Sequence, residues 1–477
     1  MNNVALDVND SFTAAYAALR SAGFWAALGS GFNGAVDCIA VDDYGRIWFG
    51  GNFTTANGVT VNYITYWDGT TFQAIGGDTK GADGRVRAIA IDANGEDVIF
   101  CGDFANVAGA AKTRICKYDV SAGTFSAYGS GLNNTGRALL VTRAGRLYVG
   151  GTFTTANGVT VNRVCYWNGS TFVAMDSGVS ATVYALAESA AGWIVAGGTF
   201  STAGSGPTTV NKVTYWNGSS WQAMGDTPGV NDTVYAIEIT PADEWFIGGA
   251  FTTADGITVN RIAGFNSNGF YALDDGLPDV VWSLKYNPYD KKLWVGGDFL
   301  YAGSNVAVGY IGTWSGAAWC HVDINLPGGF TVAAIAFDGE RVYLGGDASG
   351  TAAAAGSATA TSTGTAGAPP IFTVRRSGGT AATIESFINT TTGKRLIMRY
   401  VLASGETLTI NLATGKVISS SKGEQIGVIF PDSDIATWLI EPGANVIATF
   451  AYTSGSPTIT AYVQWENHYR AIDGAAA

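Results

Sequence analysis

Seven glycine doublets, spaced about 50 residues apart, constrain the fold of this chain more than any other feature of its sequence. Each doublet closes a short apolar run, and a phenylalanine stands two residues after six of the seven. A period of this length indicates structural repeats that bury their apolar faces against one another. The doublets, the second of which begins with cysteine, are Gly50-Gly51, Cys101-Gly102, Gly150-Gly151, Gly197-Gly198, Gly248-Gly249, Gly296-Gly297 and Gly345-Gly346.

Each repeat reads as four short strands. The third shows the pattern most clearly, with apolar runs RALLV, RLYVGGTF, NRVCYW and TFVAM separated by turn residues. Between the last two runs stands Asn168-Gly169, and Asn-Gly is the strongest short hairpin signal because both central positions of its turn need positive φ. The same turn recurs as Asp68-Gly69 and Asn217-Gly218. The third and fourth strands of a repeat are therefore expected to form a hairpin.

This repeat resembles the kelch repeat of β-propellers, with departures at Cys101 and at Ala348, where the phenylalanine is missing. The resemblance implies one four-stranded blade per repeat. Strands of the third kind occur only six times after the first doublet, so one hairpin is missing. The segment 15–25 parallels 261–271 and supplies it. We therefore expect residues 12–29 to pair with strands near 331–346 and to close the last blade, which leaves no open sheet edge.

A change of composition separates a second domain. From residue 348 to 370 every residue is Ala, Gly, Ser, Thr or Pro, which predicts a flexible spacer. Residues 371–477 then alternate short apolar runs with glycine-rich turns, which is typical of a β-sandwich. The expected fold class is all-β, with a seven-bladed propeller over 1–347 and a jelly-roll or galectin-like sandwich over 371–477.

Four motifs in the second domain carry a further resemblance: INTTTG at 388–393, GETLTI at 405–410, WLIEPGANVI at 438–447 and YVQW at 462–465. In this order and spacing they resemble the C-terminal, galectin-like domain of siphophage distal tail proteins. The resemblance implies a component of a tailed-phage virion, made in the host cytoplasm, whose C-terminal domain contacts other tail proteins or further copies of itself. The propeller stands where that family has a ring-forming domain, so its hexamer is not carried over.

Charge and composition exclude several classes of function. The formal net charge of −12 disfavours nucleic acid and anionic membranes as partners. The first residues lack the basic segment and apolar core of a secretory signal, and no apolar run is long enough to span a bilayer. The two histidines, His321 and His468, show no metal-ligand spacing, and the five cysteines fall in predicted strands as small buried residues. We expect no metal and no cofactor.

Acidic loops between the blades are the first candidate binding surface. They share one face with the loops after the glycine doublets, and their carboxylates could hold Ca²⁺ or accept hydrogen bonds from sugar hydroxyls. Asp also makes turns and solvates surfaces, which is the alternative reading. Trp282 joins this set because it breaks the repeat pattern, although packing could explain it. The candidates are Asp78, Asp83, Asp226, Asp232, Asp274, Asp275, Asp279 and Trp282.

Other motifs have a structural interpretation. The near-identical loops at 54–62, 154–162 and 252–260 could be ligand subsites, but repeated architecture also explains them. DANGED at 92–97 lacks the spacing of a calcium-binding loop and predicts a hairpin turn. No catalytic residues stand out, so the expected function is adhesion to a host surface or glycan. A glycan depolymerase that assembles its carboxylates from distant blades is the alternative.

Overall fold

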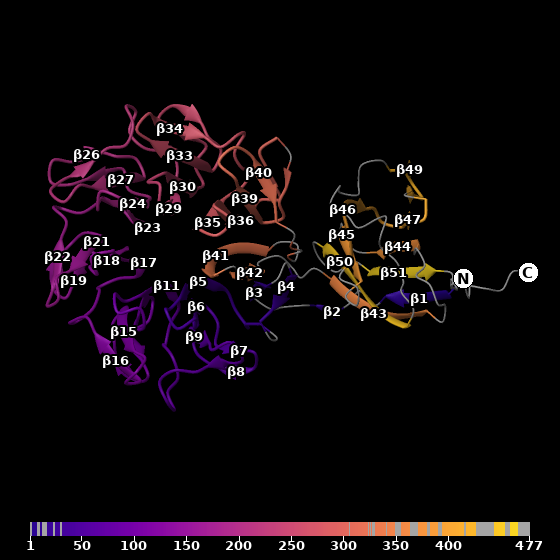
Figure 1. The fold of residues 1–477 in the computed structure, drawn as a ribbon, viewed down its shortest axis with the longest axis horizontal. Helices are drawn as coiled ribbons and strands as arrows, with labels where there is room; N and C mark the ends of the chain where they lie inside the picture. The colour runs from indigo at the N-terminus through magenta and orange to yellow at the C-terminus, as the bar shows by residue number, and fades with distance from the viewer. Residues whose placement is uncertain are drawn as a thin grey trace, which may run out of the picture. The chain divides into compact units, whose positions relative to one another are not determined.

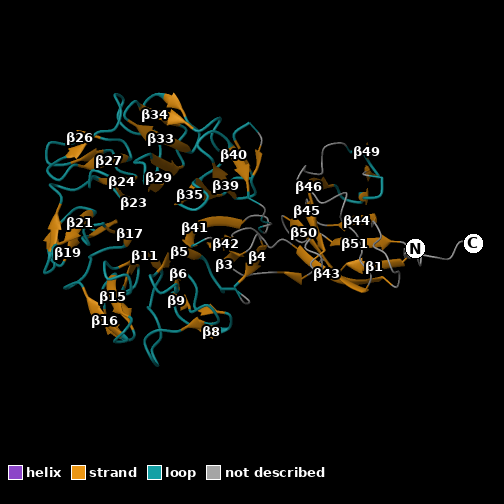
Figure 2. Cartoon of the chain, viewed as in Figure 1, coloured by secondary structure: helices purple, strands orange, loops and turns teal. Residues whose placement is uncertain are grey.

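The computed structural model is an all-β chain that divides into two compact units. The repeat unit comprises Ala14–Ile324 and Thr331–Asp347, and the terminal unit comprises Met1–Thr13, Asn325–Phe330 and Ala348–Ala477. The described residues contain strands and turns but no helix (Figure 2), so none of them forms a helix that could cross a membrane. The structure describes residues 2–6, 10–11, 17–21, 24–28, 31–304, 306–322, 324, 326, 330–339, 341–348, 354–362, 371–378, 382–389, 394–414, 416–425, 443–453 and 458–465.

Seven four-stranded antiparallel sheets make up most of the repeat unit, arrayed around a common centre in Figure 1. In each sheet one strand, called the inner strand below, lies nearest that centre. The first four sheets, from the inner strand outward, are β5 (Val36–Val41), β6 (Ile47–Gly51), β9 (Ile64–Trp67), β10 (Phe72–Gln73); β11 (Val86–Ile91), β12 (Val98–Gly102), β15 (Ile115–Asp119), β16 (Thr124–Ala127); β17 (Gly136–Val141), β18 (Leu147–Gly151), β21 (Val164–Trp167), β22 (Phe172–Ala174); and β23 (Val183–Glu188), β24 (Ile194–Gly198), β27 (Val213–Trp216), β28 (Trp221–Gln222).

The remaining three sheets follow the same order, and the last takes its outer hairpin from the N-terminal segment. They are β29 (Val234–Ile239), β30 (Trp245–Gly249), β33 (Ile262–Asn266), β34 (Gly269–Ala272); β35 (Val281–Asn287), β36 (Lys292–Gly297), β39 (Ile311–Trp314), β40 (Trp319–His321); and β41 (Phe330–Asp338), β42 (Arg341–Ala348), β3 (Ala17–Ser21), β4 (Phe24–Ala27). Two-residue ribbons form in six of the loops after the doublets: β7 (Thr55–Ala56) with β8 (Val59–Thr60), β13 (Asn106–Val107) with β14 (Ala110–Ala111), β19 (Thr155–Ala156) with β20 (Val159–Thr160), β25 (Thr202–Ala203) with β26 (Thr208–Thr209), β31 (Thr253–Ala254) with β32 (Ile257–Thr258), and β37 (Tyr301–Ala302) with β38 (Val306–Ala307).

Close packing between neighbouring sheets explains the glycine doublets. A Cβ atom added to Gly50 would lie 2.6 Å from Cγ1 of Val86, the first residue of the next inner strand. At the second doublet the two residue types are exchanged: Cys101 carries the side chain, and Gly136 stands in place of the valine, 2.7 Å from the cysteine Cβ if it had a Cβ of its own. Either pair leaves room for one side chain only. The repeat therefore conserves the filled space between sheets rather than the glycine itself.

The N-terminal hairpin joins the last sheet at the strand that the repeat count predicts. Ala17 pairs with Gly345 and Arg20 with Val342, while β4 continues the sheet on the other side of β3. A Cβ atom at Gly345 would lie 2.5 Å from Cγ1 of Val36, in the first sheet. This spacing is close to the 2.6 Å found between a Cβ at Gly50 and Val86.

The described residues of the terminal unit form two antiparallel sheets. The first has the strand order β1 (Asn2–Leu6), β51 (Thr458–Trp465), β44 (Ile371–Gly378), β47 (Thr407–Asn411), β48 (Lys416–Ser419) and β49 (Gly423–Glu424), and the second has β2 (Asp10–Ser11), β43 (Ala354–Ser362), β50 (Gly443–Thr453), β45 (Ala382–Asn389) and β46 (Lys394–Leu402). The predicted strand at 435–440, together with the motif residues 390–393 and 438–442 and His468, lies outside the described residues.

The terminal unit differs from the predicted domain boundaries in two places. Strand β43 lies inside the predicted flexible spacer and pairs along its whole length with β50. Strands β1 and β2, predicted as part of the propeller, pair with β51 and β43 instead. Small residues cannot build a core, but pairing needs only backbone N–H and C=O groups, and the alternating Ala and Thr of β43 provide them. Composition alone therefore overestimates the spacer.

A buried carboxylate occupies the second motif of the terminal unit. Glu406 is 2% exposed and accepts hydrogen bonds from the Tyr400 hydroxyl at 2.5 Å, the Ala403 backbone N–H at 2.6 Å and the Ser419 hydroxyl. Burial alone would raise its pKa, but these hydrogen bonds outweigh burial and lower the pKa to about 2. The conspicuous glutamate of this motif therefore holds strands together.

The packing of the last sheet on the first can be tested by substituting Gly345. In Gly345→Val, the new side chain meets Val36 in a filled space, and overpacking of this kind costs about 1–3 kcal/mol. Gly206→Val is the matched control, because a Cβ there meets nothing within 4 Å. We expect thermal unfolding of Gly345→Val at clearly lower temperature than the control. Equal melting temperatures would contradict this contact.

Candidate functional site

Asp83, one of the predicted acidic candidates, holds two loops together. Its Oδ1 accepts hydrogen bonds from the backbone N–H groups of Ala105 at 2.8 Å and Asn106 at 2.9 Å. Asn33 makes the same two bonds, to Thr54 and Thr55, at the equivalent place in the preceding repeat. Further equivalents accept the same pair of bonds in later repeats: Asn133, Ser180 and Asn231. Asp83 thus accepts the same two backbone hydrogen bonds that Asn or Ser accepts in other repeats, so this role does not require a carboxylate.

Asp232 and Asp279 accept hydrogen bonds from the residue that follows each of them, and Asp275 accepts one from a different loop. Asp232 accepts the N–H of Thr233 at 2.6 Å, Asp279 accepts that of Val280 at 2.8 Å, and Asp275 accepts the Ser304 hydroxyl at 3.0 Å. Such contacts are typical of turns and loop ends.

The remaining acidic candidates, Asp78, Asp226 and Asp274, are exposed in their loops. Within the described ranges, no three His, Cys, Asp or Glu side chains lie close enough together to hold a metal ion. The structure therefore distributes the predicted carboxylates over several loops instead of gathering them into one site.

The repeated loops also have a structural role. Asn62, Asn162 and Asn260 each donate a side-chain N–H to a backbone carbonyl in the next inter-sheet loop, at 2.9, 3.0 and 2.9 Å. Each has φ between 43° and 48°, a conformation that asparagine tolerates better than most residues. The loop geometry therefore accounts for the repeated sequence.

Trp282 is the predicted residue that leads to a different kind of site. Its indole Nε1 donates to Asp298 Oδ2 at 2.7 Å, and its ring lies 4.3 Å from that of Tyr235, centroid to centroid. Tyr235 in turn lies 5.2 Å from Tyr184. The guanidinium carbon of Arg137 lies 5.1 Å from the centroid of the Tyr184 ring. Four neighbouring sheets thus contribute one continuous row of side chains.

A shared backbone irregularity positions this row. In each of the first six sheets, the register between the two inner strands shifts by one residue, as at a β-bulge. The extra residue follows the buried first residue of the inner strand and is half-buried. Bulges re-aim side chains and are frequent beside functional sites. The six extra residues are Asp37, Arg87, Arg137, Tyr184, Tyr235 and Trp282.

We call these six residues, together with Arg85, Asp103 and Asp298, the axial cluster. Arg85 binds Asp37 with two hydrogen bonds of 2.5 Å, and Arg87 binds Asp103 at 2.7 and 2.8 Å. Burial alone would raise the pKa of Asp103, but the hydrogen bonds from Arg87 and from Thr135 lower it. Both carboxylates on this side of the cluster are therefore paired with arginines.

Arg137 differs from the other two arginines. Its Nε is buried and has no hydrogen-bond partner, and no carboxylate pairs with its guanidinium among the described residues. Burial lowers the pKa of Arg137, and the nearby cations Arg87 and Arg85 lower it further. An unpaired buried donor is costly, and each such group in a folded protein calls for an explanation.

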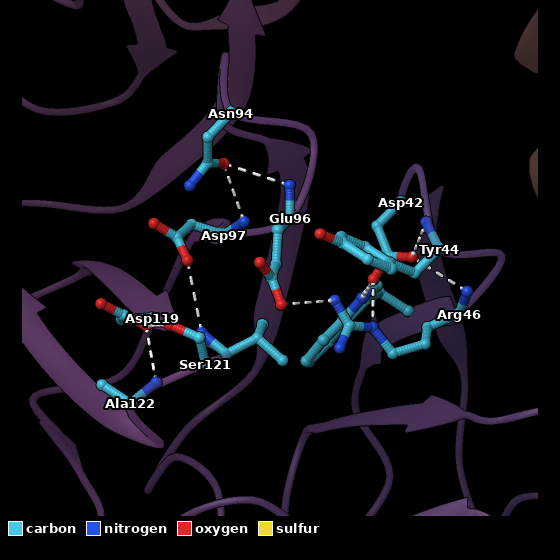
Figure 3. A network of polar contacts seen from close by, with 11 residues as sticks. Asp42, Tyr44, Arg46, Asn94, Glu96, Asp97, Asp119, Ser121 and Ala122 are labelled. Atoms are coloured by element: carbon cyan, nitrogen blue, oxygen red, sulfur yellow. Dashed lines mark hydrogen bonds and ion pairs between the residues drawn. The ribbon is translucent and has the colours of Figure 1, made fainter.

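The turns between the first two strands of each sheet carry a separate polar network. Asp42 is buried and accepts Arg46 Nε at 2.6 Å and Trp48 Nε1 at 2.9 Å, while Arg46 reaches Glu96 of the next sheet at 3.5 Å. Figure 3 shows this network, in which Asn94 also accepts the backbone N–H of Glu96. Every charge drawn there has a partner. We interpret the network as structural, joining the first two sheets.

A cavity of about 510 Å³ lies near these turns, lined by residues that include Lys117, Tyr128, Arg146 and Trp167. Lys117 Nζ is bound by Asp92 and, at 2.9 Å, by Asp97. Its cation is thus already neutralised by two carboxylates, which makes this cavity a weaker candidate than the axial cluster.

Three of the five cysteines, Cys101, Cys116 and Cys165, are buried as the sequence predicts, whereas Cys38 and Cys320 are half-buried. Burial raises the pKa of Cys116 to about 12 and raises that of Cys38, Cys101 and Cys165 as well. A raised pKa removes the thiolate that redox and nucleophilic chemistry need. His321 donates or accepts through Nδ1 at 2.8 Å from the Ala307 carbonyl oxygen.

Comparison with known proteins supports the coarse fold. A family profile described as the Rax2 C-terminal beta propeller domain matches residues 70–244. The chain is thus an all-β protein with a propeller-type domain. Among curated proteins, no match was found.

Three solved structures show distant similarity. The first is the extracellular domain of a one-component system from B. thetaiotaomicron, with 12% identity, 81% of this chain and 50% of that chain covered, and a TM-score of 0.45. The second is the corresponding domain of a hybrid two-component system from the same organism, with 12% identity, coverage of 79% and 44%, and a TM-score of 0.45. The third is a chain of a Mitotic Checkpoint Complex, with 14% identity, coverage of 71% and 93%, and a TM-score of 0.43. This chain spans about half the length of the first two.

The role of Asp83 can be tested with two substitutions. Asp83→Ala removes an acceptor of three hydrogen bonds in a solvent-screened loop and should lower the free energy of unfolding by about 1 kcal/mol. Asp83→Asn should be nearly neutral at pH 7, because Asn33 does the same work in the first repeat.

The pH dependence of stability distinguishes the wild-type protein from Asp83→Asn. The pKa of Asp83 is lowered in the folded state, so its stabilisation is present above about pH 4 and is lost as the pH falls through the folded pKa. Urea unfolding between pH 3 and 7 should show this loss in the wild type and not in Asp83→Asn. If Asp83→Ala unfolds like the wild type but loses Ca²⁺ binding, the structural interpretation is wrong.

Proposed function

We propose that this chain is a component of a tailed-phage virion, associated with the tail, that displays its repeat unit for adhesion to a host surface or glycan. The axial cluster carries the adhesion part of this proposal. It combines a row of half-buried aromatic side chains with an unpaired arginine, which is the mixture of apolar surface and few polar groups typical of ligand sites.

The architecture within this proposal is a seven-bladed propeller closed by the N-terminal hairpin. Seven four-stranded sheets and the pairing of β3 with β42 support it. The contact between Gly345 and Val36 supports closure, because it repeats the geometry found between the other sheets. A closed ring has no exposed sheet edge and so resists edge-to-edge aggregation.

The terminal unit is proposed to be a β-sandwich that docks onto other tail proteins or onto further copies of the chain. Its two antiparallel sheets support the sandwich, and the motifs from 388 to 465 that resemble distal tail proteins support the location. In the particle the protein would be a homo-oligomer, with its repeat units available to the host surface.

Binding is favoured over hydrolysis by the state of the carboxylates. A glycosidase needs one carboxyl group with a raised pKa as general acid and a second as base or nucleophile. In the axial cluster Asp37 and Asp103 are paired with arginines, Asp298 accepts from Trp282 and Thr331, and the pKa of Asp103 is lowered. This arrangement suits recognition better than proton transfer.

Two measurements test the proposal. Mass spectrometry of purified virions should detect the chain as a particle component, and its absence from particles would contradict the virion assignment. The purified protein should adsorb to host cells without releasing reducing sugar from their surface polysaccharide. Steady release of reducing sugar would instead establish the depolymerase.

A further inference from the structure

The structure points to one ligand class for the axial cluster: we propose that it binds an acidic saccharide, with a sugar carboxylate at Arg137 and sugar rings against Tyr184, Tyr235 and Trp282. This inference rests on the proposed adhesion function and deepens it by naming the ligand chemistry. It assigns the ligand to the centre of the repeat unit rather than to the acidic outer loops.

The positions of these residues favour a ligand site over packing. The repeat fixes the residue before each of them, since five of the six are preceded by a buried valine. The extra residue of each register shift, in contrast, is acidic, basic or aromatic in different repeats. A residue needed only to build the sheet would recur from repeat to repeat. Variation at a re-aimed, half-buried position is instead what recognition of one asymmetric ligand needs.

The aromatic half of the cluster offers a fixed surface for sugar rings. Tyr184, Tyr235 and Trp282 follow one another at centroid distances of 5.2 and 4.3 Å. The bond from Trp282 Nε1 to Asp298, which also accepts the Thr331 hydroxyl at 2.5 Å, fixes the indole. Burial raises the pKa of Tyr235, so its hydroxyl stays protonated as a donor. Large rigid rings with a polar edge bind amphipathic ligands at low cost in conformational entropy.

The basic half supplies a cation that the protein leaves unmatched. Arg85 and Arg87 are each held by an aspartate, whereas Arg137 has no ion-pair partner among the described residues and lies over the Tyr184 ring. A guanidinium forms two parallel hydrogen bonds with a carboxylate, so one sugar carboxylate would pair with the terminal nitrogens of Arg137, while its Nε stays buried. Because Arg137 stands at the end of the aromatic row, a carboxylate bound there leaves the sugar chain to extend along the rings.

The charge of the whole chain further restricts the chemical class of the ligand. A net charge of −12 opposes diffuse binding of polyanions, and three arginines, two of them paired, are too few for a nucleic-acid backbone. A neutral saccharide would leave Arg137 unpaired. A saccharide that carries carboxylates at intervals along its chain fits both halves of the cluster. Its sugar rings pack against the aromatic side chains while one carboxylate binds Arg137.

A matched panel of saccharides tests this inference on the full-length protein. The probes are trimers of galacturonate, glucuronate and sialate, together with the same trimers in which each carboxyl is reduced to a hydroxymethyl group. We expect at least one acidic trimer to bind at least tenfold more tightly than its reduced form by calorimetry, with an affinity that falls as NaCl is raised.

Substitutions assign the binding to the cluster. Arg137→Gln should weaken binding of that acidic trimer at least tenfold and leave the weak binding of the reduced trimer unchanged, whereas Tyr235→Ala should weaken both. Arg143→Gln is the control: Arg143 is an exposed arginine whose charge partner, Glu188, lies in the neighbouring sheet, and it should change affinity less than twofold. Tyr235→Phe should retain most of the affinity lost in Tyr235→Ala.

Two results would overturn the inference. One is equal binding of every acidic trimer and its reduced form, including no binding of either. The other is unchanged affinity in Arg137→Gln when circular dichroism and melting temperature show that the variant is folded. These outcomes are independent of the proposed function, because adsorption of the wild-type protein to cells would still support adhesion through another surface.

Discussion

Contact between the end of one sheet's second strand and the start of the next sheet's inner strand determines the rest of the repeat unit. At this point one partner carries a side chain and the other is a glycine, as in Gly248 with Val281, where an added Cβ would lie 2.4 Å from the valine Cγ1. Protein interiors are packed at the density of organic crystals, so such a contact fixes the distance and angle between sheets. The exchange of partners at Cys101 and Gly136 shows that the filled volume is what the repeat preserves.

The same contact separates what the fold requires from what function can use. The valine of the inner strand packs against the neighbouring sheet. The loops outside it are joined by hydrogen bonds of residues such as Asp83 and Asn62. The residue after the valine neither fills the contact between sheets nor joins the loops. The register shift places this residue at the same position in the first six sheets, where it is half-buried beside the packed valine or glycine. A recognition surface can therefore vary there at little cost in stability.

Much of the fold follows from the sequence because its signals are local and repeated. Glycine doublets and Asn-Gly turns locate the strands of each repeat, and the missing hairpin predicts the pairing of β3 with β42. The strand at 354–362 could not be predicted, since pairing of its backbone with β50 leaves no mark in a run of Ala, Gly, Ser and Thr. The pairing of β1 with β51 joins the two ends of the chain, and no local pattern encodes such a contact.

The candidate site was only partly visible in the sequence. Trp282 stands out because it breaks the repeat, but Arg137, Tyr184 and Tyr235 look like ordinary alternating strand residues. Aspartates in loops attract attention because they can bind metals and sugars, yet turns use the same residue for hydrogen bonds to their own backbone. The usable signal was the position after the first residue of the inner strand, where acidic, basic and aromatic residues replace one another while the preceding residue is valine in five of six strands.

The central claim is that recognition takes place at the centre of the repeat unit and not on its outer loops. An experimental structure of the protein with a bound acidic trisaccharide tests it most directly. The account predicts a sugar ring against Tyr235 and Trp282 and a carboxylate within hydrogen-bonding distance of Arg137. A saccharide bound only by the outer loops, with Arg137 still unpaired, would contradict it.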